Sequence, residues 1–407
     1  MRIKSAFYAL VLGTLMAFQV KAELPLVYDQ ENTGAAYGAP VFPAYNELVS
    51  APLLPDPFAW SDGRGYVQDF SEWARRRNEI KAEIEHYEIG YKPDKPDRVS
   101  SSFDGSELTV EITHEGETMV LTSKVIVPEG DGPFPVVIGM NFPTGSLPPE
   151  LFEGVIQVAF MHNQVVTSSH QGQRDPDAAY FRLYPELEHV GYYSAWSWGI
   201  SRLIDGIEQQ ADALNANTRK IAVTGCSYAG KMALFAGAFD ERIALTIAQE
   251  SGGGGVNAWR VAEVIGEVEK ISNTNYSWFM PGLRTNFNGR ADLLPYDHHE
   301  LMAMIVPRAL LVLGNPDFKW LGDEAGYVAS RAVEEVYKSF GIEDRFGFSF
   351  RKDHGHCQLP EDSYEEVGSF VKRFLFDDKD ANTHVRFHTF PGVDYGHWMK
   401  EWQARQE

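Results

Sequence analysis

The chain has 407 residues, of which 44% are hydrophobic, so it is long and apolar enough to bury a large core. Its 36 lysines and arginines stand against 57 aspartates and glutamates, and the resulting net charge of −21 argues against nucleic acids and anionic lipid surfaces as partners. The aromatic content of 13%, with 9 tryptophans, suits an aromatic core and also a protein that stacks on sugar rings.

The N-terminus has the pattern of a secretory signal peptide. A basic start precedes an apolar run that is too short to span a bilayer, and Ala22 provides a small residue for cleavage. We therefore predict that residues 1–22 are removed and that residues 23–407 form the mature protein, secreted or periplasmic. No later segment of the sequence is apolar enough to cross a membrane. An oxidising compartment would allow disulfides to persist.

Strand and helix patterns alternate along the mature chain. Residues 23–65 lack periodicity and are expected to wrap the surface, residues 73–87 have helical periodicity, and residues 107–127 alternate as antiparallel strands do. Buried strands are predicted at residues 135–140, 155–160, 220–226, 243–248 and 309–313, and helices at residues 196–209 and from near Met232. This order implies one domain with a mostly parallel sheet that helices cover on both faces.

Ser227 lies on the turn between the predicted strand 220–226 and the helix that follows. Its Gly-x-Ser-x-x-Gly surroundings are those of a nucleophile elbow, which lifts a serine hydroxyl out of a sheet, although a serine here could also serve only as a helix cap. The two cysteines favour the catalytic role, because Cys226 precedes Ser227 and Cys357 follows His356. A disulfide between them would hold His356, as a base, within reach of the serine.

Several blocks of this sequence, taken together and in order, resemble the glucuronoyl esterases of carbohydrate esterase family 15. The blocks are residues 196–202, 225–231, 240–252, 295–308, 319–322 and 354–357. The resemblance implies an α/β-hydrolase fold, that is, a three-layer sandwich with a mostly parallel central sheet. It also implies a serine esterase that needs no metal or cofactor and hydrolyses the ester between 4-O-methyl-glucuronic acid on xylan and lignin alcohols.

The same resemblance assigns the catalytic residues. It implies Ser227 as the nucleophile, His356 as the base and Glu250 as the acid that orients the base. The alternative for Glu250 is a carboxylate that caps the glycine-rich turn after it. Asp317 is the reserve acid, because some members of the family supply the acid after a later strand. His354 competes with His356, but the family's base directly precedes the bridging cysteine.

Substrate contacts are also implied by the resemblance. Lys231 matches a lysine that holds sugar hydroxyls, Glu267 a glutamate that contacts the glucuronoyl unit, and Trp320 a tryptophan that contacts the sugar. Their alternatives are a solvated lysine, an exposed helical glutamate and a core aromatic residue. Tyr228 departs from the family pattern, in which an arginine that is thought to stabilise the oxyanion follows the nucleophile. The Tyr228 hydroxyl, or a donor from the loop at residues 140–145, would have to replace it.

The expected partner is a plant or algal polysaccharide that carries uronate esters. We expect a monomer that binds no nucleic acid and, after removal of the signal peptide, no membrane. The departure at Tyr228 puts the identity of the substrate in question more than the class of reaction. An acetyl-xylan or other carbohydrate deacylase with the same triad is therefore the alternative function. A carbohydrate-binding descendant without activity is a further one, against which the intact Ser227, His356 and Glu250 argue.

Overall fold

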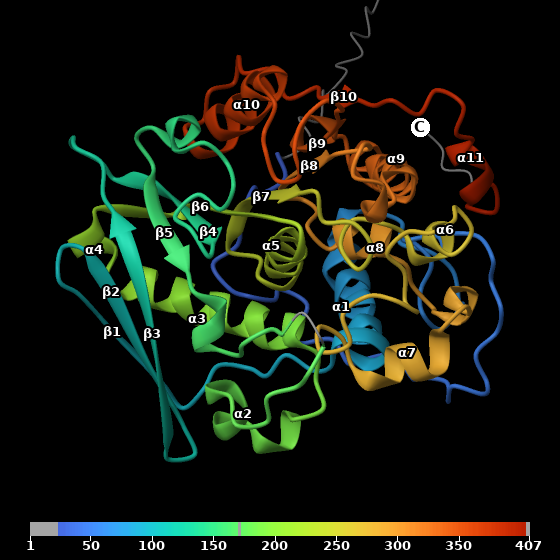
Figure 1. Ribbon diagram of the computed structural model, residues 1–407, viewed down its shortest axis with the longest axis horizontal. Coiled ribbons are helices and arrows are strands. Elements are labelled where there is room, and N and C mark those ends of the chain that lie inside the picture. The colour runs from blue at the N-terminus through green and yellow to red at the C-terminus, as the bar shows by residue number, and fades with distance from the viewer. Residues whose placement is uncertain (1–22, 170–171, 404–407) are drawn as a thin grey trace, which may run out of the picture.

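In the computed structural model, residues 23–169 and 172–403 are described, and a ten-stranded sheet runs through this part of the chain (Figure 1). The strand order is β1-β2-β3-β5-β4-β6-β7-β8-β9-β10. Pairings from β1 through β3 to β5 are antiparallel, and all the pairings that follow are parallel. The strands are β1 (Arg98–Phe103), β2 (Glu107–His114), β3 (Glu117–Ile126), β4 (Phe134–Met140), β5 (Ile156–Phe160), β6 (Ala216–Cys226), β7 (Ile243–Gln249), β8 (Ala309–Gly314), β9 (Phe346–Phe350) and β10 (Arg386–Phe387). The predicted signal peptide, residues 1–22, lies outside the described residues.

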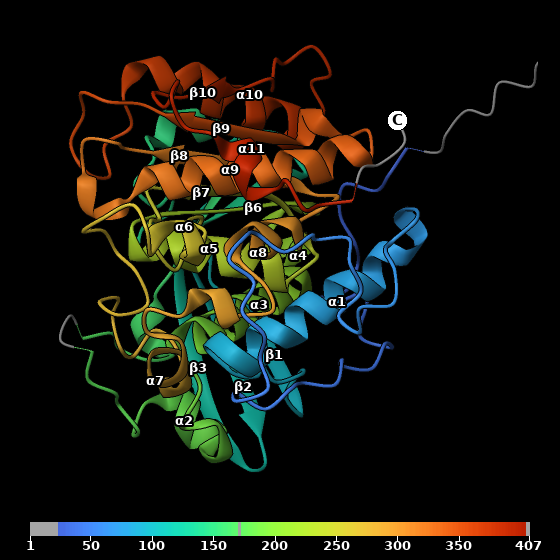
Figure 2. The same cartoon turned by 90° about the vertical axis from the view of Figure 1, so that its right-hand side faces the viewer.

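Helices cover both faces of this sheet (Figure 2). On one face α3, α5 and α9 contact the strands, with α1 and α8 packed outside them, and on the other face α10 contacts β6, β7 and β8. The helices are α1 (Trp73–Ile84), α2 (Ala179–Leu183), α3 (Tyr192–Gln209), α4 (Ala211–Leu214), α5 (Tyr228–Phe239), α6 (Trp259–Ala262), α7 (Pro281–Phe287), α8 (His298–Ala303), α9 (Asp323–Ser339), α10 (Tyr364–Leu375) and α11 (Tyr395–Trp398). The three layers and the mostly parallel sheet confirm the predicted architecture.

The strand β4 shows why the sheet is buried on both faces. Val136 and Ile138 point into the larger core under α3 and α5, whereas Val137 points into the smaller core, where Phe370 and Phe374 of α10 pack. Successive side chains of a strand face opposite sides, so an unbroken apolar run needs a helix layer on each side. Each fully buried side chain of this kind stabilises the fold by about 1.5–3 kcal/mol relative to leaving it in water.

The predicted strands and the helical segments 73–87 and 196–209 are found in the structure, and the stretch 23–65 contains no helix or strand beyond one isolated bridge. Three starts lie four residues before the predicted ones: α3 begins at Tyr192, β6 at Ala216, and the helix expected from near Met232 at Tyr228. The helix α5 begins early because the Lys231 N–H donates to the Ser227 carbonyl at 3.0 Å, which closes the first helical turn directly on the elbow. Sequence patterns alone did not predict three strands and seven helices of the described residues: β1, β9, β10, α2, α4, α6, α7, α9, α10 and α11.

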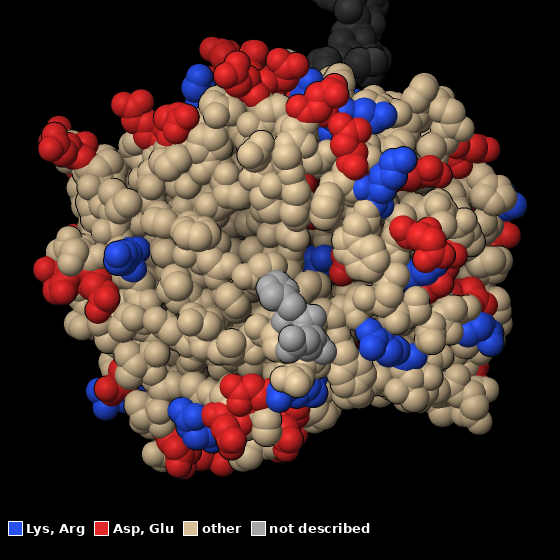
Figure 3. All heavy atoms as spheres, viewed as in Figure 1, with Lys and Arg blue, Asp and Glu red and all other residues tan. Residues whose placement is uncertain are grey.

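Charge is unevenly distributed over the molecule. Figure 3 shows a face with few charged side chains at its centre, around α3, α5 and strands β4 to β6, and with acidic side chains gathered towards its rim. The centre of this face therefore contributes little to the net charge of −21.

Candidate active site

Ser227 is the single residue between β6 and α5, with φ 60° and ψ −126°. This conformation is unfavourable for a residue with a Cβ atom. The Ser227 N–H donates to the Gln249 carbonyl at 3.0 Å, which ties the turn to the end of β7. A Cβ on Gly225 would lie 2.3 Å from the Ala229 oxygen, and one on Gly230 would lie 2.3 Å from the Gln249 oxygen. Both glycines are therefore needed for the turn that holds the serine at the carboxyl edge of the sheet.

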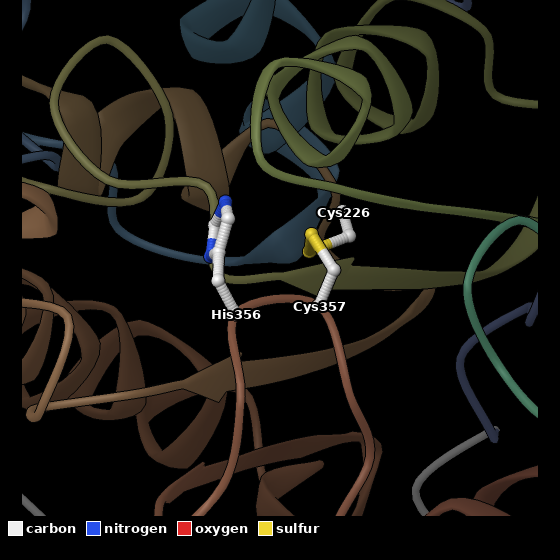
Figure 4. Close-up of side chains that lie close together, drawn as sticks. All are labelled: Cys226, His356 and Cys357. Carbon is white, nitrogen blue, oxygen red and sulfur yellow. A yellow bond between two sulfur atoms is a disulfide. The ribbon is translucent and has the colours of Figure 1, made fainter.

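Cys226 and Cys357 form a disulfide, as predicted, with Cα atoms 5.7 Å apart (Figure 4). It joins the end of β6 to the loop between β9 and α10. A ring nitrogen of His356 lies within 4.8 Å of both sulfur atoms. This trio is spaced as metal ligands are, but two sulfurs that are bonded to each other are not thiolate donors. The bridge therefore serves to bring the loop of His356 to the residue before Ser227.

Glu250 and His356 form a tightly hydrogen-bonded pair. Glu250 directly follows β7 and is only 1% exposed, and its Oε2 lies 2.6 Å from His356 Nδ1. Its other oxygen accepts the Cys357 N–H at 3.0 Å, so each carboxylate oxygen has its own donor. The imidazole stacks on Phe318, with ring centroids 4.2 Å apart. In this arrangement Nδ1 carries the ring hydrogen and donates it to the carboxylate, which leaves Nε2 free for proton transfer.

The two competing assignments have other contacts in the structure. His354 Nδ1 lies 3.8 Å from Glu250 Oε1, beyond hydrogen-bond distance, and its other nitrogen contacts the Arg351 carbonyl at 3.2 Å. Asp317 is exposed and accepts the Asp353 N–H at 2.8 Å. Of the predicted acids and bases, the structure thus brings together Glu250 and His356.

A second carboxyl near this pair was not anticipated. Asp323 is the first residue of α9 and is 5% exposed, and its Oδ2 has no hydrogen-bond partner within the described residues. Burial, and secondly the nearby charge of Glu250, raise the pKa of Asp323 to about 8. Asp323 is therefore protonated at neutral pH. Its sequence context gave no signal, because an acid in the first turn of a helix is ordinary.

Lys231, in the first turn of α5, is paired with a glutamate. Its Nζ lies 2.9 Å from Glu269 Oε2, both side chains are almost fully buried, and the ammonium lies 5.1 Å from the centre of the Trp278 ring. The Thr274 hydroxyl donates to the other Glu269 oxygen at 2.8 Å. The Glu269 N–H donates to the Trp320 carbonyl at 2.8 Å, and the Trp320 side chain is 44% exposed. Lys231 and Trp320 are thus linked through Glu269.

Glu267, the glutamate singled out from the sequence, is exposed, and Glu269 is the one that contacts Lys231. Residues 266–269 read Gly-Glu-Val-Glu, and Val268 between the two acids is buried. Two equivalent acids two positions apart gave no basis in the sequence for choosing the one that faces inward.

Tyr228 is the first residue of α5 and is half-buried. Its ring stacks on Trp278 with centroids 5.9 Å apart, and its Oη accepts a hydrogen bond from Asn141 Nδ2 at 2.9 Å. Asn141 begins the loop after β4, the loop that the sequence suggested as a source of donors. The two candidate donors to the oxyanion, the Tyr228 hydroxyl and the side-chain amide of Asn141, are therefore hydrogen-bonded to each other.

Comparison with known proteins defines the family. The model of the fungal glucuronyl esterases matches residues 110–341, more than half of the chain. The 4-O-methyl-glucuronoyl methylesterase 1 of Wolfiporia cocos is 35% identical over 399 residues, which cover 94% of this chain and 93% of the relative. The chain belongs to the glucuronoyl esterase family. Both the predicted family and the predicted class of enzyme, a carboxylic ester hydrolase, are confirmed.

Solved structures of glucuronoyl esterases agree with the fold described here. The catalytic domain of the Hypocrea jecorina glucuronoyl esterase is 31% identical with a TM-score of 0.80, covering 89% of this chain and 98% of that one. A variant of the Sporotrichum thermophile enzyme, in complex with methyl 4-O-methyl-β-D-glucopyranuronate, is 32% identical with a TM-score of 0.82, covering 89% and 97%. The α/β-hydrolase fold is thereby confirmed. Among the described residues, no helix of this glucuronoyl esterase has the length and apolar character needed to span a membrane.

Proposed function

We propose that this glucuronoyl esterase hydrolyses the ester that joins 4-O-methyl-glucuronoyl groups of xylan to alcohols, including lignin alcohols. The observation that carries the proposal is the 2.6 Å pair of Glu250 and His356, which the disulfide ties to the residue before Ser227. The similarity to an enzyme solved with methyl 4-O-methyl-β-D-glucopyranuronate supports the class of substrate.

The proposed reaction is acyl transfer in two steps. His356 Nε2 takes the Ser227 proton while the serine oxygen attacks the ester carbonyl, and the imidazolium that forms is stabilised by Glu250. The imidazolium then protonates the departing alcohol, which leaves the glucuronoyl group bound to Ser227. In the second step His356 takes a proton from water, the resulting hydroxide attacks the acyl group, and Ser227 recovers its proton. The proposal assigns stabilisation of the oxyanion in both steps to the Tyr228 backbone N–H, because in this fold the residue after the nucleophile supplies such a donor.

The sugar is assigned to the side of the elbow where Lys231 lies. Lys231 and Glu269 offer a donor and an acceptor for neighbouring sugar hydroxyls, and the exposed ring of Trp320 offers a flat apolar surface. The esterified substrate carries no charge on its carboxyl group, whereas the product acid does. A protein with a net charge of −21 therefore favours release of the product over its retention.

In this proposal residues 23–407 form one catalytic domain, made after removal of residues 1–22 as a signal peptide. It acts as a secreted or periplasmic monomer on a plant or algal polysaccharide that carries uronate esters. Two contacts that join distant parts of the chain support a single domain. Arg345 donates to the Leu24 and Pro25 carbonyls at 2.7 and 2.8 Å, and the Trp402 indole donates to the Leu54 carbonyl at 2.8 Å.

The test compares the mature protein with its Ser227→Ala variant on methyl 4-O-methyl-glucuronate and on acetylated xylan. We expect the wild type to cleave the glucuronate ester and Ser227→Ala to lose at least ~1,000-fold in kcat with its folding unchanged. Ser339→Ala, which removes an exposed hydroxyl on α9, is the matched control. Activity retained in Ser227→Ala would contradict the mechanism. Faster release of acetate than of methanol would instead favour the carbohydrate deacylase.

A further inference from the structure

Tyr228 is held in a fixed position beside the candidate nucleophile. Its ring stacks on Trp278 at an angle of 16° between the ring planes, and the His162 ring meets it edge-on with centroids 5.7 Å apart. Its Oη accepts a hydrogen bond from Asn141 Nδ2. Because the phenol accepts at this contact, its own hydrogen is directed to a different acceptor.

Asn141 is fixed by the loop that follows β4. It has a left-handed φ of 68°, and its N–H donates to the Phe160 carbonyl at 2.9 Å. The loop packs so closely on the elbow strand that a Cβ on Gly145 would lie 3.0 Å from the Thr224 oxygen. Since β4 is the sheet neighbour of β6, this loop borders the turn that carries Ser227. In this fold, the loop after the neighbouring strand is where the second oxyanion donor comes from.

His162 determines which way the Asn141 amide faces. Its Nδ1 contacts Asn141 Oδ1. Burial lowers the pKa of His162 to about 4, so near neutral pH the ring is uncharged and carries a single hydrogen. An amide oxygen can only accept, so that hydrogen is on Nδ1. With its oxygen held by this hydrogen, Asn141 presents its NH₂ group to Tyr228.

We propose that His162, Asn141 and Tyr228 form an ordered hydrogen-bond chain that makes the Tyr228 hydroxyl a second, uncharged donor to the oxyanion. This inference rests on the proposed esterase function and deepens it. His162 Nδ1–H donates to Asn141, Asn141 Nδ2–H donates to Tyr228, and the Tyr228 O–H donates to the oxygen that becomes negative. Tyr228 keeps its proton throughout, so Tyr228 is a catalytic residue, and Asn141 and His162 are positioning residues.

The chain has a direction, and that direction is the functional feature. All three donors point the same way, so each polarises the next, and the last one presents its hydrogen to developing charge. Such a preorganised donor stabilises the transition state more than the neutral ester, and its loss lowers kcat by about 100- to 1,000-fold. A tyrosine that only packed against Trp278 would not have this effect.

The first experiment removes the donor and keeps the ring. Tyr228→Phe preserves the stacking on Trp278, and we expect kcat on methyl 4-O-methyl-glucuronate to fall at least ~100-fold while KM changes less than about threefold. Tyr395→Phe is the matched control, because it removes a hydroxyl that bonds Arg331 away from the site. An unchanged kcat in Tyr228→Phe, or a change confined to KM, would overturn the proposal.

The second experiment reverses the chain without breaking it. In Asn141→Asp the carboxylate accepts from both neighbours, so the Tyr228 hydroxyl donates to residue 141 and turns away from the oxyanion. We expect kcat to fall as in Tyr228→Phe although the contacts and the melting temperature are kept, and the double variant to be no worse than either single one. A fully active Asn141→Asp would overturn the directional chain. If that variant does not fold, Tyr228→Phe decides alone.

These outcomes are separable from those that test the proposed function. A wild type that does not cleave the glucuronate ester, or a Ser227→Ala variant that does, removes the esterase mechanism itself. An active wild type and an inactive Ser227→Ala, together with a fully active Tyr228→Phe, would refute only the hydrogen-bond chain.

Discussion

Replacing Glu250 by glutamine tests the central hydrogen bond of the site. One carboxylate oxygen of Glu250 lies 2.6 Å from His356 Nδ1, and the other accepts from the Cys357 backbone at 3.0 Å and, at 3.4 Å, from Gln249 Nε2. A glutamine has one oxygen and one NH₂ group, so it can accept on only one of these two sides. The Cys357 N–H cannot change, whereas an imidazole can move its hydrogen. The amide oxygen should therefore stay on Cys357, and its NH₂ group should face His356.

The consequence for the base is a wrong tautomer. With NH₂ beside it, Nδ1 of His356 must accept, so the ring hydrogen moves to Nε2, the atom that has to take the Ser227 proton. The loss of the correct tautomer and of the carboxylate charge together lowers kcat by about 1,000- to 10,000-fold, which corresponds to about 4–5 kcal/mol of barrier. KM should change little, because Glu250 is buried beneath His356 and does not reach the substrate.

The assay is the release of acid from methyl 4-O-methyl-glucuronate at constant pH, with kcat and KM measured separately for each variant. Asp317→Asn is the matched control, since this reserve acid bonds the Asp353 N–H and not the imidazole. Glu250→Gln within tenfold of the wild type, or Asp317→Asn as impaired as Glu250→Gln, would refute the assignment of the acid.

Two further predictions concern stability. Replacing Cys226 and Cys357 by serine opens a loop with a sequence separation of 131 residues. It should lower the free energy of unfolding by about 5 kcal/mol in the chain-entropy model, and kcat should fall as His356 loses its anchor; an unchanged denaturation midpoint and kcat would contradict this. Asp323, with its pKa raised from 3.8 to about 8, binds a proton in the folded state that the unfolded chain releases, so stability should fall from pH 4 to 8, by up to about 1.4 kcal/mol per unit. Asp323→Asn should flatten this fall in urea titrations, and an unaltered pH dependence would disprove the account.

Sequence patterns were sufficient to predict those parts of the fold and of the site in which burial or a tight turn restricts the type of residue. An apolar run such as residues 135–140 can be stable only between two helix layers, and the glycines around Ser227 fit only a crowded turn. Because Cys226 precedes Ser227 and Cys357 follows His356, the two cysteines also predicted that the loop of His356 lies beside the nucleophile. These features follow from steric and solvation demands that act on each residue locally.

Other features depended on contacts that no local pattern encodes. Glu250 follows Ser227 by 23 residues, and the two lie close together only because β7 is the neighbour of β6 in the sheet. The sequence separation does not reveal this, so only the family resemblance suggested that acid. Glu267 and Glu269 are equivalent in sequence and differ only in which one faces Lys231. Asp323 gave no signal, because its burial arises from the packing of α9 against the end of β8.

The backbone of Ser227 also bears on how such a protein would change if its activity were no longer needed. Its φ of 60° and ψ of −126° cost about 1–3 kcal/mol for a residue with a Cβ atom, and glycine adopts them freely. Loss of the nucleophile to glycine would thus make the protein more stable and inactive in one step. A lineage released from selection for catalysis should drift to glycine here, so glycine at this position would distinguish a former esterase from a working one.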